Sequence, residues 1–220
     1  MIKDSIILIG CGEHARVSID AIEAQGRYRI FGLVSNREDE LHLRVYGHEV
    51  ICTDAEVRQL VAENADIKGY FLGVGVASGS MKRRCDLYTW LDEILPAVNV
   101  ISPHSVVSSY ARMGRGNFLE AYTRIANGVT IGNHCVVQSF TSINHDQIIG
   151  DNVLIGCNVS MAGSRIGSHT TIADGSSISF KKTVGSNCLV SDGTVVTKDL
   201  PNDVIAYGNP AKTLPRKDAS

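Results

Sequence analysis

The sequence predicts two domains of different class, a small α/β domain followed by a parallel β-helix. Apolar, strand-like segments alternate with amphipathic, helix-like segments in the first hundred residues, and after them an aliphatic residue recurs every six residues. The chain has 220 residues, of which 44% are hydrophobic, so each domain can bury a core. We expect the α/β domain over residues 1–102, the β-helix over 103–200 and a C-terminal tail over 201–220.

Charge and composition exclude several kinds of partner. The formal net charge is −2, and 21 basic and 23 acidic residues are scattered along the chain, so no surface for nucleic acid or an anionic membrane is predicted. The N-terminal apolar run is too short for a signal peptide or a membrane span, and we expect a cytoplasmic protein. Six cysteines without a C-x-x-C pair indicate reduced thiols rather than a zinc ribbon or a disulfide framework.

The first element is a strand, a glycine turn and a helix in "SIILIGCGEHARVSIDAIEAQG". Gly10, Gly12 and Ala15 match the pattern G-x-G-x-x-A, which is typical of a Rossmann-like turn but weak when taken alone. Such a turn lets the backbone approach phosphate groups at the N-terminus of a helix. Glu13 and His14, which follow the turn, are further candidates for substrate contacts.

The second strand, "RIFGLVSN", ends at Ser35 and Asn36. An NAD-binding domain usually places an acidic residue at this point to bind the adenosine ribose, so the pair speaks against NAD. We expect Ser35 and Asn36 to hydrogen-bond a nucleobase or a ribose instead.

A third strand, "GYFLGVG", covers residues 69–75 and includes Gly73, another candidate for a substrate contact. The helix predicted after it, "MKRRCDLYTWLDEIL", carries Arg83 and Arg84 near its start, and either of them could meet a diphosphate. A solvated basic first turn is the open alternative. Further along this helix, Trp90 and Leu91 are expected in the core rather than in a stacking platform.

The second half of the chain carries a six-residue period. The aliphatic positions are Val107, Met113, Leu119, Ile125, Ile131, Val137, Ile143, Ile149, Ile155, Met161, Ile166, Ile172, Ile178, Val184, Val190 and Val196. One step, from Met161 to Ile166, has five residues instead of six. This period fits neither a helix nor an alternating strand, but it fits a coil in which each short strand points one aliphatic side chain inward and then turns.

A slower period gives the length of one coil. Glycine follows the aliphatic residue at intervals of three hexapeptides, so one coil has eighteen residues, and one coil is shortened to seventeen. About five coils would stack as a triangular prism at the roughly 4.8 Å spacing of neighbouring strands. Residues that tolerate a left-handed backbone recur between the strands and are expected at corners: His134, Asn152, His169 and Asn187 on one edge, and Gly128, Asn158, Gly175 and Gly193 elsewhere.

A zinc site between histidines is the alternative for His134 and His169. These two residues are two coils apart, which separates their backbones by about 9 to 10 Å, whereas the nitrogen ligands of one zinc ion lie about 2.1 Å from it. His145 lies on another edge, and we predict no metal site.

His145 departs from the corner pattern because it stands one place before a corner that Asp146 occupies. A step of eighteen residues leads from His145 to Gly163, which we place one coil above the imidazole. A histidine base below an unhindered backbone N–H suits acyl transfer, since the base takes a proton from the acceptor while the N–H stabilises an oxyanion. A merely polar, solvated corner is the open alternative.

The hexapeptide array, the "NHD" followed by "IGDN", the stretch "MAGSRIGSHTTI" and the closing "VVTKDLPNDVIAYGNPAK" resemble the left-handed β-helix acetyltransferases. With its N-terminal domain, the chain is similar to the subfamily of sialic acid O-acetyltransferases and nucleotide-amino-sugar N-acetyltransferases. The resemblance implies a left-handed coil and a homotrimer that binds acetyl-CoA between neighbouring β-helices. It also implies that His145 is the general base and that the N–H of Gly163 faces the thioester. We expect Asp146 to orient or polarise the imidazole, and a side chain that points elsewhere from the adjacent corner is the open alternative.

The resemblance further implies coenzyme contacts near Phe180, Lys181 and Lys212. In many relatives a second histidine follows the first after nine residues, whereas this chain has Leu154 there. Any help from that second histidine is therefore absent.

The predicted activity is acetyl-CoA-dependent N-acetylation of a nucleotide-linked amino sugar, such as a 4-amino-4,6-dideoxy sugar, in bacterial surface glycan synthesis. O-acetylation of sialic acid or a related sugar is the nearer alternative. A trimeric, non-catalytic protein that binds nucleotide sugars is the more distant one.

Overall fold

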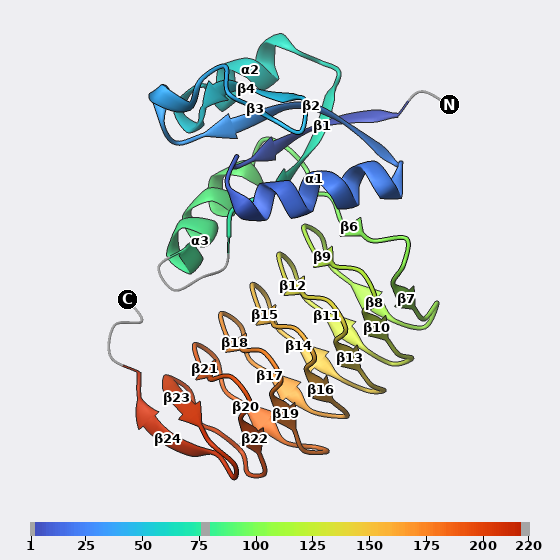
Figure 1. Ribbon diagram of the computed structural model, residues 1–220, viewed down its shortest axis with the longest axis vertical. Helices are drawn as coiled ribbons and strands as arrows, with labels where there is room; N and C mark the ends of the chain where they lie inside the picture. Colours follow the sequence, from blue (N-terminus) through green and yellow to red (C-terminus); the bar gives the residue numbers. More distant parts are fainter. Residues whose placement is uncertain (1–2, 76–79, 217–220) are drawn as a thin grey trace. The chain divides into compact units, whose positions relative to one another are not determined.

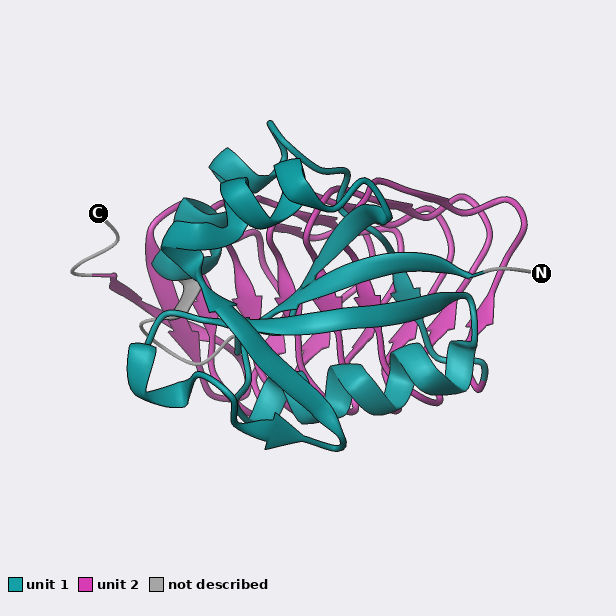
Figure 2. Cartoon of the chain, turned by 90° about the horizontal axis from the view of Figure 1, so that it is seen from above, with its two compact units in different colours: residues 1–103 teal, residues 104–220 magenta. Residues whose placement is uncertain are grey.

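The computed structural model describes residues 3–75 and 80–216. The chain divides into two units, Met1–Pro103 and His104–Ser220 (Figure 2). The first is an α/β domain and the second a parallel β-helix, so the predicted fold class is confirmed.

Unit 1 is built on a mostly parallel sheet with the strand order β3-β4-β2-β1-β5 (Figure 1). Strands β1, β2, β4 and β5 are parallel, and β3 pairs antiparallel with β4 at the edge. The strands are β1 (Asp4–Ile9), β2 (Tyr28–Ser35), β3 (Arg44–Val45), β4 (His48–Thr53) and β5 (Ile67–Leu72), and a short strand β6 (Val100–Ile101) follows near the end of the unit.

The helices of unit 1 are α1 (Glu13–Gln25), α2 (Val57–Glu63) and α3 (Ser80–Leu91), with short 3-10 turns η1 (Glu38–Glu40) and η2 (Asp54–Glu56). Helix α1 buries Ala15, Ile19 and Ile22 on one face, and it ends where Gly26 adopts a left-handed φ of 67°. Leu91 on α3 is fully buried in the same core as Tyr70, as the sequence predicted, whereas Trp90 is partly buried and packs against this core.

Unit 2 is a stack of two-residue strands (Figure 1). Within the described residues there are sixteen of them: β7 (Val106–Val107), β8 (Arg112–Met113), β9 (Phe118–Leu119), β10 (Arg124–Ile125), β11 (Thr130–Ile131), β12 (Val136–Val137), β13 (Ser142–Ile143), β14 (Ile148–Ile149), β15 (Leu154–Ile155), β16 (Ser160–Met161), β17 (Arg165–Ile166), β18 (Thr171–Ile172), β19 (Ser177–Ile178), β20 (Thr183–Val184), β21 (Leu189–Val190) and β22 (Val195–Val196). The second residue of each strand is one of the predicted aliphatic positions, and from Leu119 to Val196 all of these are 3% exposed or less.

The strands of unit 2 form three parallel sheets, one on each side of the coil. The first sheet runs from β7 through β10, β13, β16 and β19 to β22, and the second runs from β8 through β11, β14 and β17 to β20. The third includes β9, β12, β15, β18 and β21, and it continues into β23 (Val204–Tyr207) and β24 (Lys212–Pro215). The segment expected as a separate tail thus extends this sheet, with β23 parallel to β21 and β24 antiparallel to β23.

The corners of the coil have left-handed backbones. His134, Asn152, His169 and Asn187 have φ values of 56°, 51°, 60° and 56°, as the sequence predicted. Tyr122 and Phe140 also take corner positions, with φ of 62° each, and their rings stack at a centroid distance of 5.1 Å. Nothing in the sequence pattern indicated these aromatic corners, because bulky residues seldom adopt positive φ.

The two residues of β14 provide a matched test of the inward positions. Ile149 is 2% exposed and Ile148 is 39% exposed. We expect Ile149→Ala to lower the free energy of unfolding by about 2 to 5 kcal/mol, because it leaves a cavity inside the coil. Ile148→Ala should cost less than about 1 kcal/mol. Urea denaturation of both variants measures the difference, and equal losses would contradict the assignment of the inward face.

Candidate functional site

The candidate catalytic region lies on the edge where the first and second sheets of unit 2 meet. The corners of this edge are Gly128, Asp146, Gly163 and Lys181, with φ values of 72°, 57°, 59° and 59°. His145 precedes the corner at Asp146, and its side chain is 52% exposed. The imidazole Nδ1 lies 3.0 Å from Asp146 Oδ2, so the two predicted catalytic side chains contact each other. This contact orients the ring and leaves Nε2 for a substrate.

The seventeen-residue coil gives this edge a short turn. Between β16 and β17 the turn has three residues, Ala162, Gly163 and Ser164, whereas the turn from β13 to β14 has four. Gly163 occupies the corner, so our prediction that it matches the place of His145 is wrong. The shortened turn lacks that place altogether, because the missing residue is the one before the corner.

The missing residue brings together the turns on either side of it. The rings of His145 and Phe180 come within 5.9 Å of each other, centroid to centroid, although their turns belong to coils on either side of the short one. A Cβ on Gly163 would lie 2.7 Å from Cε2 of Phe180, so the ring packs directly on this glycine and any larger residue would displace it. We call the part of this edge formed by His145, Ala162, Gly163 and Phe180 the notch.

The hydrogen bonds of the backbone amides in the short turn differ from the prediction. The N–H of Gly163 donates to the carbonyl oxygen of His145 at 2.9 Å, so it is not the unhindered donor that we expected. In other coils the residue after each strand of the first sheet donates to the next coil, as Ala126 does to Ile143 and Asn144 does to Met161. The corresponding N–H of Ala162 has no acceptor among the described residues. The shortened turn thus leaves a backbone donor available beside the notch.

Gln147 supports the short turn from below. It is fully buried, and its Oε1 accepts a hydrogen bond from the N–H of Ser164 at 3.0 Å. Sequence reasoning missed both Gln147 and Ala162, because their importance depends on where the coil absorbs its missing residue.

The predicted coenzyme contacts do not all come together in one chain. Lys181 follows Phe180, and its Nζ lies 5.2 Å from the centre of that ring. Lys212 is on β24, in the third sheet, whereas His145 lies at the junction of the other two sheets. In a three-sided coil this junction is opposite the third sheet, so Lys212 and His145 do not meet within one chain.

The predicted substrate residues of unit 1 do come together. Gly10, Gly12, Glu13, His14, Ser35, Asn36, Gly73 and Arg83 all line one pocket of about 420 Å³, together with Cys11, Glu40, Val74 and Gly75. The pocket lies at the carboxyl ends of β1, β2 and β5, where the ligands of open parallel sheets bind. The first hydrogen bond within α1 runs from the N–H of Arg16 to the carbonyl oxygen of Gly12. The amides that precede Arg16 therefore face this end of the sheet.

Glycine is required at the start of this pocket. Gly10 has a φ of 115°, and a Cβ there would lie 2.8 Å from the carbonyl oxygen of Gly73. The N–H of Gly10 donates to the carbonyl of Val34 at 2.7 Å. The turn after β1 therefore packs closely between the ends of β2 and β5.

Two predicted contacts are already engaged by the protein. Arg83 binds Asp54 at 2.9 Å, although it still lines the pocket. Ser35 is 2% exposed, donates its hydroxyl proton to Glu40 and accepts the N–H of Arg37 at 3.1 Å. Ser35 therefore holds Glu40 in place. Sequence reasoning missed Glu40 because it lies five residues beyond β2, on η1.

The titratable groups of the pocket have shifted pKa values, which determine their charges near pH 7. Hydrogen bonds from Cys11 and Ser35 lower the pKa of Glu40, which keeps its carboxylate ionised. Burial and the neighbouring Glu40 raise the pKa of Cys11, which keeps its thiol protonated. Burial, together with the charge of Arg84, lowers the pKa of His14 to about 4. His14 is therefore neutral in the folded protein near pH 7.

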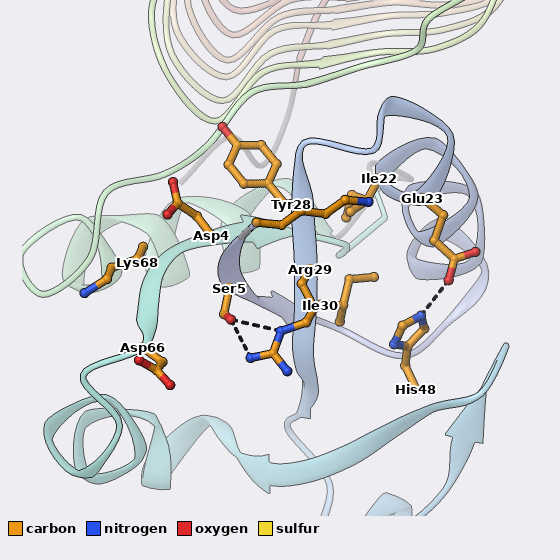
Figure 3. A pocket seen from close by; sticks show the side chains of 11 residues that line it. Asp4, Ser5, Ile22, Glu23, Tyr28, Arg29, Ile30, His48, Asp66 and Lys68 are labelled. Atoms are coloured by element: carbon orange, nitrogen blue, oxygen red, sulfur yellow. Dashed lines mark hydrogen bonds and ion pairs between the residues drawn. The ribbon is translucent and has the colours of Figure 1, made fainter. Parts of the chain in front are cut away.

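A larger cavity of about 720 Å³ lies at the opposite end of the same sheet (Figure 3). It is lined by residues at the starts of β1, β2, β4 and β5, where a parallel sheet does not usually bind ligands. Its polar side chains are partly paired, since Arg29 donates to Ser5 and His48 lies 2.9 Å from Glu23 (Figure 3). We therefore place the candidate site at the glycine turn.

Comparisons with known proteins match both units. Residues 5–91 match the family model of the PglD N-terminal domain, and residues 110–145 match that of the bacterial transferase hexapeptide (six repeats). Unit 1 thus contains a PglD-type N-terminal domain, and unit 2 contains bacterial transferase hexapeptide repeats. The resemblance predicted from the sequence is thus confirmed.

Solved structures similar to this chain cover almost all of it. A His-to-Asn variant of perosamine N-acetyltransferase from Caulobacter crescentus, in complex with CoA and GDP-perosamine, is 27% identical, with a TM-score of 0.87 over 96% of both chains. The acetyltransferase domain of PglB from Neisseria gonorrhoeae, in complex with acetyl coenzyme A, has the same fold, with 24% identity and a TM-score of 0.85 over 97% of this chain and all of that one.

A curated relative matches over a shorter range. The acyl-[acyl-carrier-protein]–UDP-N-acetylglucosamine O-acyltransferase of Pseudomonas savastanoi pv. phaseolicola is 27% identical over 114 residues. The match covers 51% of this chain and 42% of that protein, so the chain spans less than half the length of this relative.

Two other findings concern the described ranges alone. No group of three or more histidine, cysteine, aspartate or glutamate side chains there could hold a metal ion. No helix in the same ranges is long and apolar enough to cross a bilayer.

The low pKa of His14 makes stability depend on pH. The pKa of His14 is about 4 in the folded chain and 6.5 when unperturbed, so the unfolded chain binds the extra proton first as the pH falls. Stability is unaffected above about pH 6.5, and we expect a loss of roughly 3 kcal/mol between there and pH 4. Urea denaturation across this range should show a shallower slope for His14→Gln, and an unchanged slope would contradict the assignment.

Proposed function

We propose that this chain transfers the acetyl group of acetyl-CoA to the amine of a nucleotide-linked amino sugar. The observation that carries this proposal is the match to perosamine N-acetyltransferase over 96% of both chains, since that structure holds CoA and GDP-perosamine. An amino-deoxy sugar of bacterial surface glycans is the substrate class, and the cytoplasm is the proposed location. The two sites fit these ligands, because the notch offers a base and a backbone donor for acyl transfer and the pocket of unit 1 suits a nucleoside diphosphate.

The nucleotide is held in the pocket of unit 1. Its diphosphate lies against the amides of Gly12 and Glu13 at the start of α1, with Arg83 as the nearby cation. Arg83 can serve a phosphate while it remains bound to Asp54, because a guanidinium has five N–H donors.

His145 acts as the general base at the notch. Its Nε2 takes a proton from the sugar amine as the amine attacks the thioester carbon, and Asp146 holds the ring through Nδ1. The C–N bond forms, the C–S bond breaks, and the imidazolium returns its proton to the departing CoA thiolate. The oxyanion that develops on the thioester accepts a hydrogen bond from the N–H of Ala162. Gly163, which has no side chain, lets the Phe180 ring pack beside His145.

A homotrimer completes the site in this proposal. The notch lies on an exposed edge, where His145 and Phe180 are 52% and 53% exposed. A neighbouring β-helix would cover this edge, form a groove for acetyl-CoA and supply Lys212, which one chain cannot bring to its own His145.

Two alternatives are less well supported. O-acetylation of sialic acid or a related sugar would use the same base, and the curated relative is an O-acyltransferase. A free sugar acid, however, would leave the glycine turn and the pocket of unit 1 without a role. A non-catalytic nucleotide-sugar-binding protein would have no use for the notch.

A substrate panel distinguishes these functions. The chain should acetylate an amino sugar linked to UDP, dTDP or GDP in the presence of acetyl-CoA, with a mass increase of one acetyl group on the sugar. Efficient use of free sialic acid would favour the O-acetyltransferase. A chain that binds no acetyl-CoA by calorimetry would be the non-catalytic protein.

Substitution of the base tests the mechanism. His145→Asn should remain folded and keep its oligomeric state but lose about 100-fold to 10,000-fold in kcat, because no other side chain at the notch can take the proton. Asp146→Asn should lose only about 3-fold to 10-fold, because solvent screens this exposed pair. His104→Asn, a histidine in the first coil, is the matched control and should retain activity. Near-normal turnover by His145→Asn would refute the proposed role.

A further inference from the structure

Glu40 occupies a position in the pocket of unit 1 that the strand pattern did not predict. The turn η1 brings its side chain back to the end of β2, where Oε2 accepts hydrogen bonds from the hydroxyl of Ser35 and, at 3.0 Å, from the thiol of Cys11. Ser35 is buried, and Cys11 lies in the glycine turn. Donors from two different segments therefore fix the orientation of this carboxylate before any ligand binds.

The second oxygen of this carboxylate remains available. Oε1 lies 3.8 Å from Nε of Arg37, which is too far for a hydrogen bond. Arg37 is instead engaged with Asp39, whose Oδ1 accepts from the same Nε at 2.9 Å. The Glu40 side chain is 25% exposed and lines the pocket. A ligand in the pocket thus meets an ionised acceptor whose rotamer is already set.

The chemistry of a nucleotide determines which part can face Glu40. A diphosphate has no donor at neutral pH, and its charge would be repelled by the carboxylate. The phosphates therefore belong at the start of α1 and at Arg83. The donors of a nucleotide are the hydroxyls of its ribose and the N–H groups of its base, both of which are uncharged. Hydrogen bonds from such groups to a carboxylate are strong, because one partner is ionised.

We infer that Glu40 selects the nucleoside of the substrate by accepting a hydrogen bond from an uncharged donor, either a ribose hydroxyl or a base N–H. This inference rests on the proposed function, since it requires that the pocket hold a nucleotide. Ser35 and Cys11 act as positioning residues that keep the carboxylate turned toward the ligand. A dinucleotide-binding domain usually carries an acidic residue where this chain has Ser35 and Asn36. Here Glu40 brings a carboxylate to the pocket instead.

Calorimetry with free nucleotides tests this inference without acetyl transfer. GDP, UDP and dTDP are titrated into the full chain, and the tightest ligand is compared with its 2′-deoxy, 3′-deoxy and base-modified analogues, such as IDP for GDP. dTDP already lacks the 2′-hydroxyl. We expect one analogue that lacks a donor to raise Kd about 10-fold or more, because hydrogen bonds to charged groups contribute about 1.5 to 3 kcal/mol. The analogue that loses affinity identifies the ribose or the base as the donor.

The variant Glu40→Gln gives the second arm. It should bind the preferred nucleotide about 10-fold or more weakly, and it should no longer distinguish that nucleotide from the analogue. Inorganic diphosphate should bind the variant as well as the wild type or better, because a negative charge has been removed. Glu38→Gln, on the same turn, is the matched control and should leave every Kd unchanged.

The outcomes separate this inference from the proposed function. If the wild type binds no nucleoside diphosphate, the nucleotide-linked substrate is wrong and the inference is overturned with it. If the wild type binds a nucleotide but Glu40→Gln binds it equally well or more tightly, only the role of Glu40 is overturned. Should the variant fail to fold, the wild-type titrations decide alone, since equal affinity for every analogue contradicts a donor at Glu40.

Discussion

Each coil of the β-helix must satisfy its backbone hydrogen bonds on the coils before and after it. This requirement fixes the register of every strand. Ser142, for example, pairs with Ser160 of the next coil and donates its N–H to the carbonyl oxygen of Val159. A deleted residue cannot be absorbed in a strand without reversing the inward and outward faces, so it is absorbed at a corner. The corner chosen is the one above His145, and the result is a close approach of Phe180 to His145 and an amide, that of Ala162, with no acceptor in the described part of the chain. The notch is therefore a consequence of coil geometry rather than of any particular side chain.

The two sites divide the chemistry of the proposed reaction between different kinds of scaffold. In unit 2 the backbone is rigid and repetitive, which suits a base and an oxyanion donor that must be held in a fixed relation. In unit 1 the pocket is assembled from the ends of three strands and the η1 turn, and it combines helix amides and a cation with the carboxylate of Glu40. Because the pocket contains opposite charges at different places, the diphosphate and the nucleoside prefer different parts of the pocket. A nucleotide is therefore expected to bind in one orientation.

The features of the β-helix that follow from its six-residue period could be predicted from the sequence. The features that depend on where this period breaks could not. The sixteen aliphatic positions and the corners at His134 and His169 followed from counting, because each coil repeats the environment of the last. A step of eighteen residues from His145 also led to Gly163. Because this coil has seventeen residues, Gly163 is at the corner itself and not at the place before the corner that His145 occupies. Ala162 and Gln147 could be found only once the turn was seen. Glu40 escaped because the pattern of strands and helices fixes the end of β2, whereas the path of the turn after it depends on tertiary contacts with Cys11 and Ser35.

The exposure of the notch bears on the number of chains needed for activity. A thioester attacked on an open edge would be surrounded by water, which weakens the hydrogen bond to an oxyanion and competes with the amine. Leu154 belongs to β15 in the third sheet, away from the edge that carries His145, as does Lys212 on β24. Groups on the third sheet can therefore assist His145 only from another copy. Leu154 is only 8% exposed, so its replacement of a second histidine leaves the base and its Asp146 partner intact.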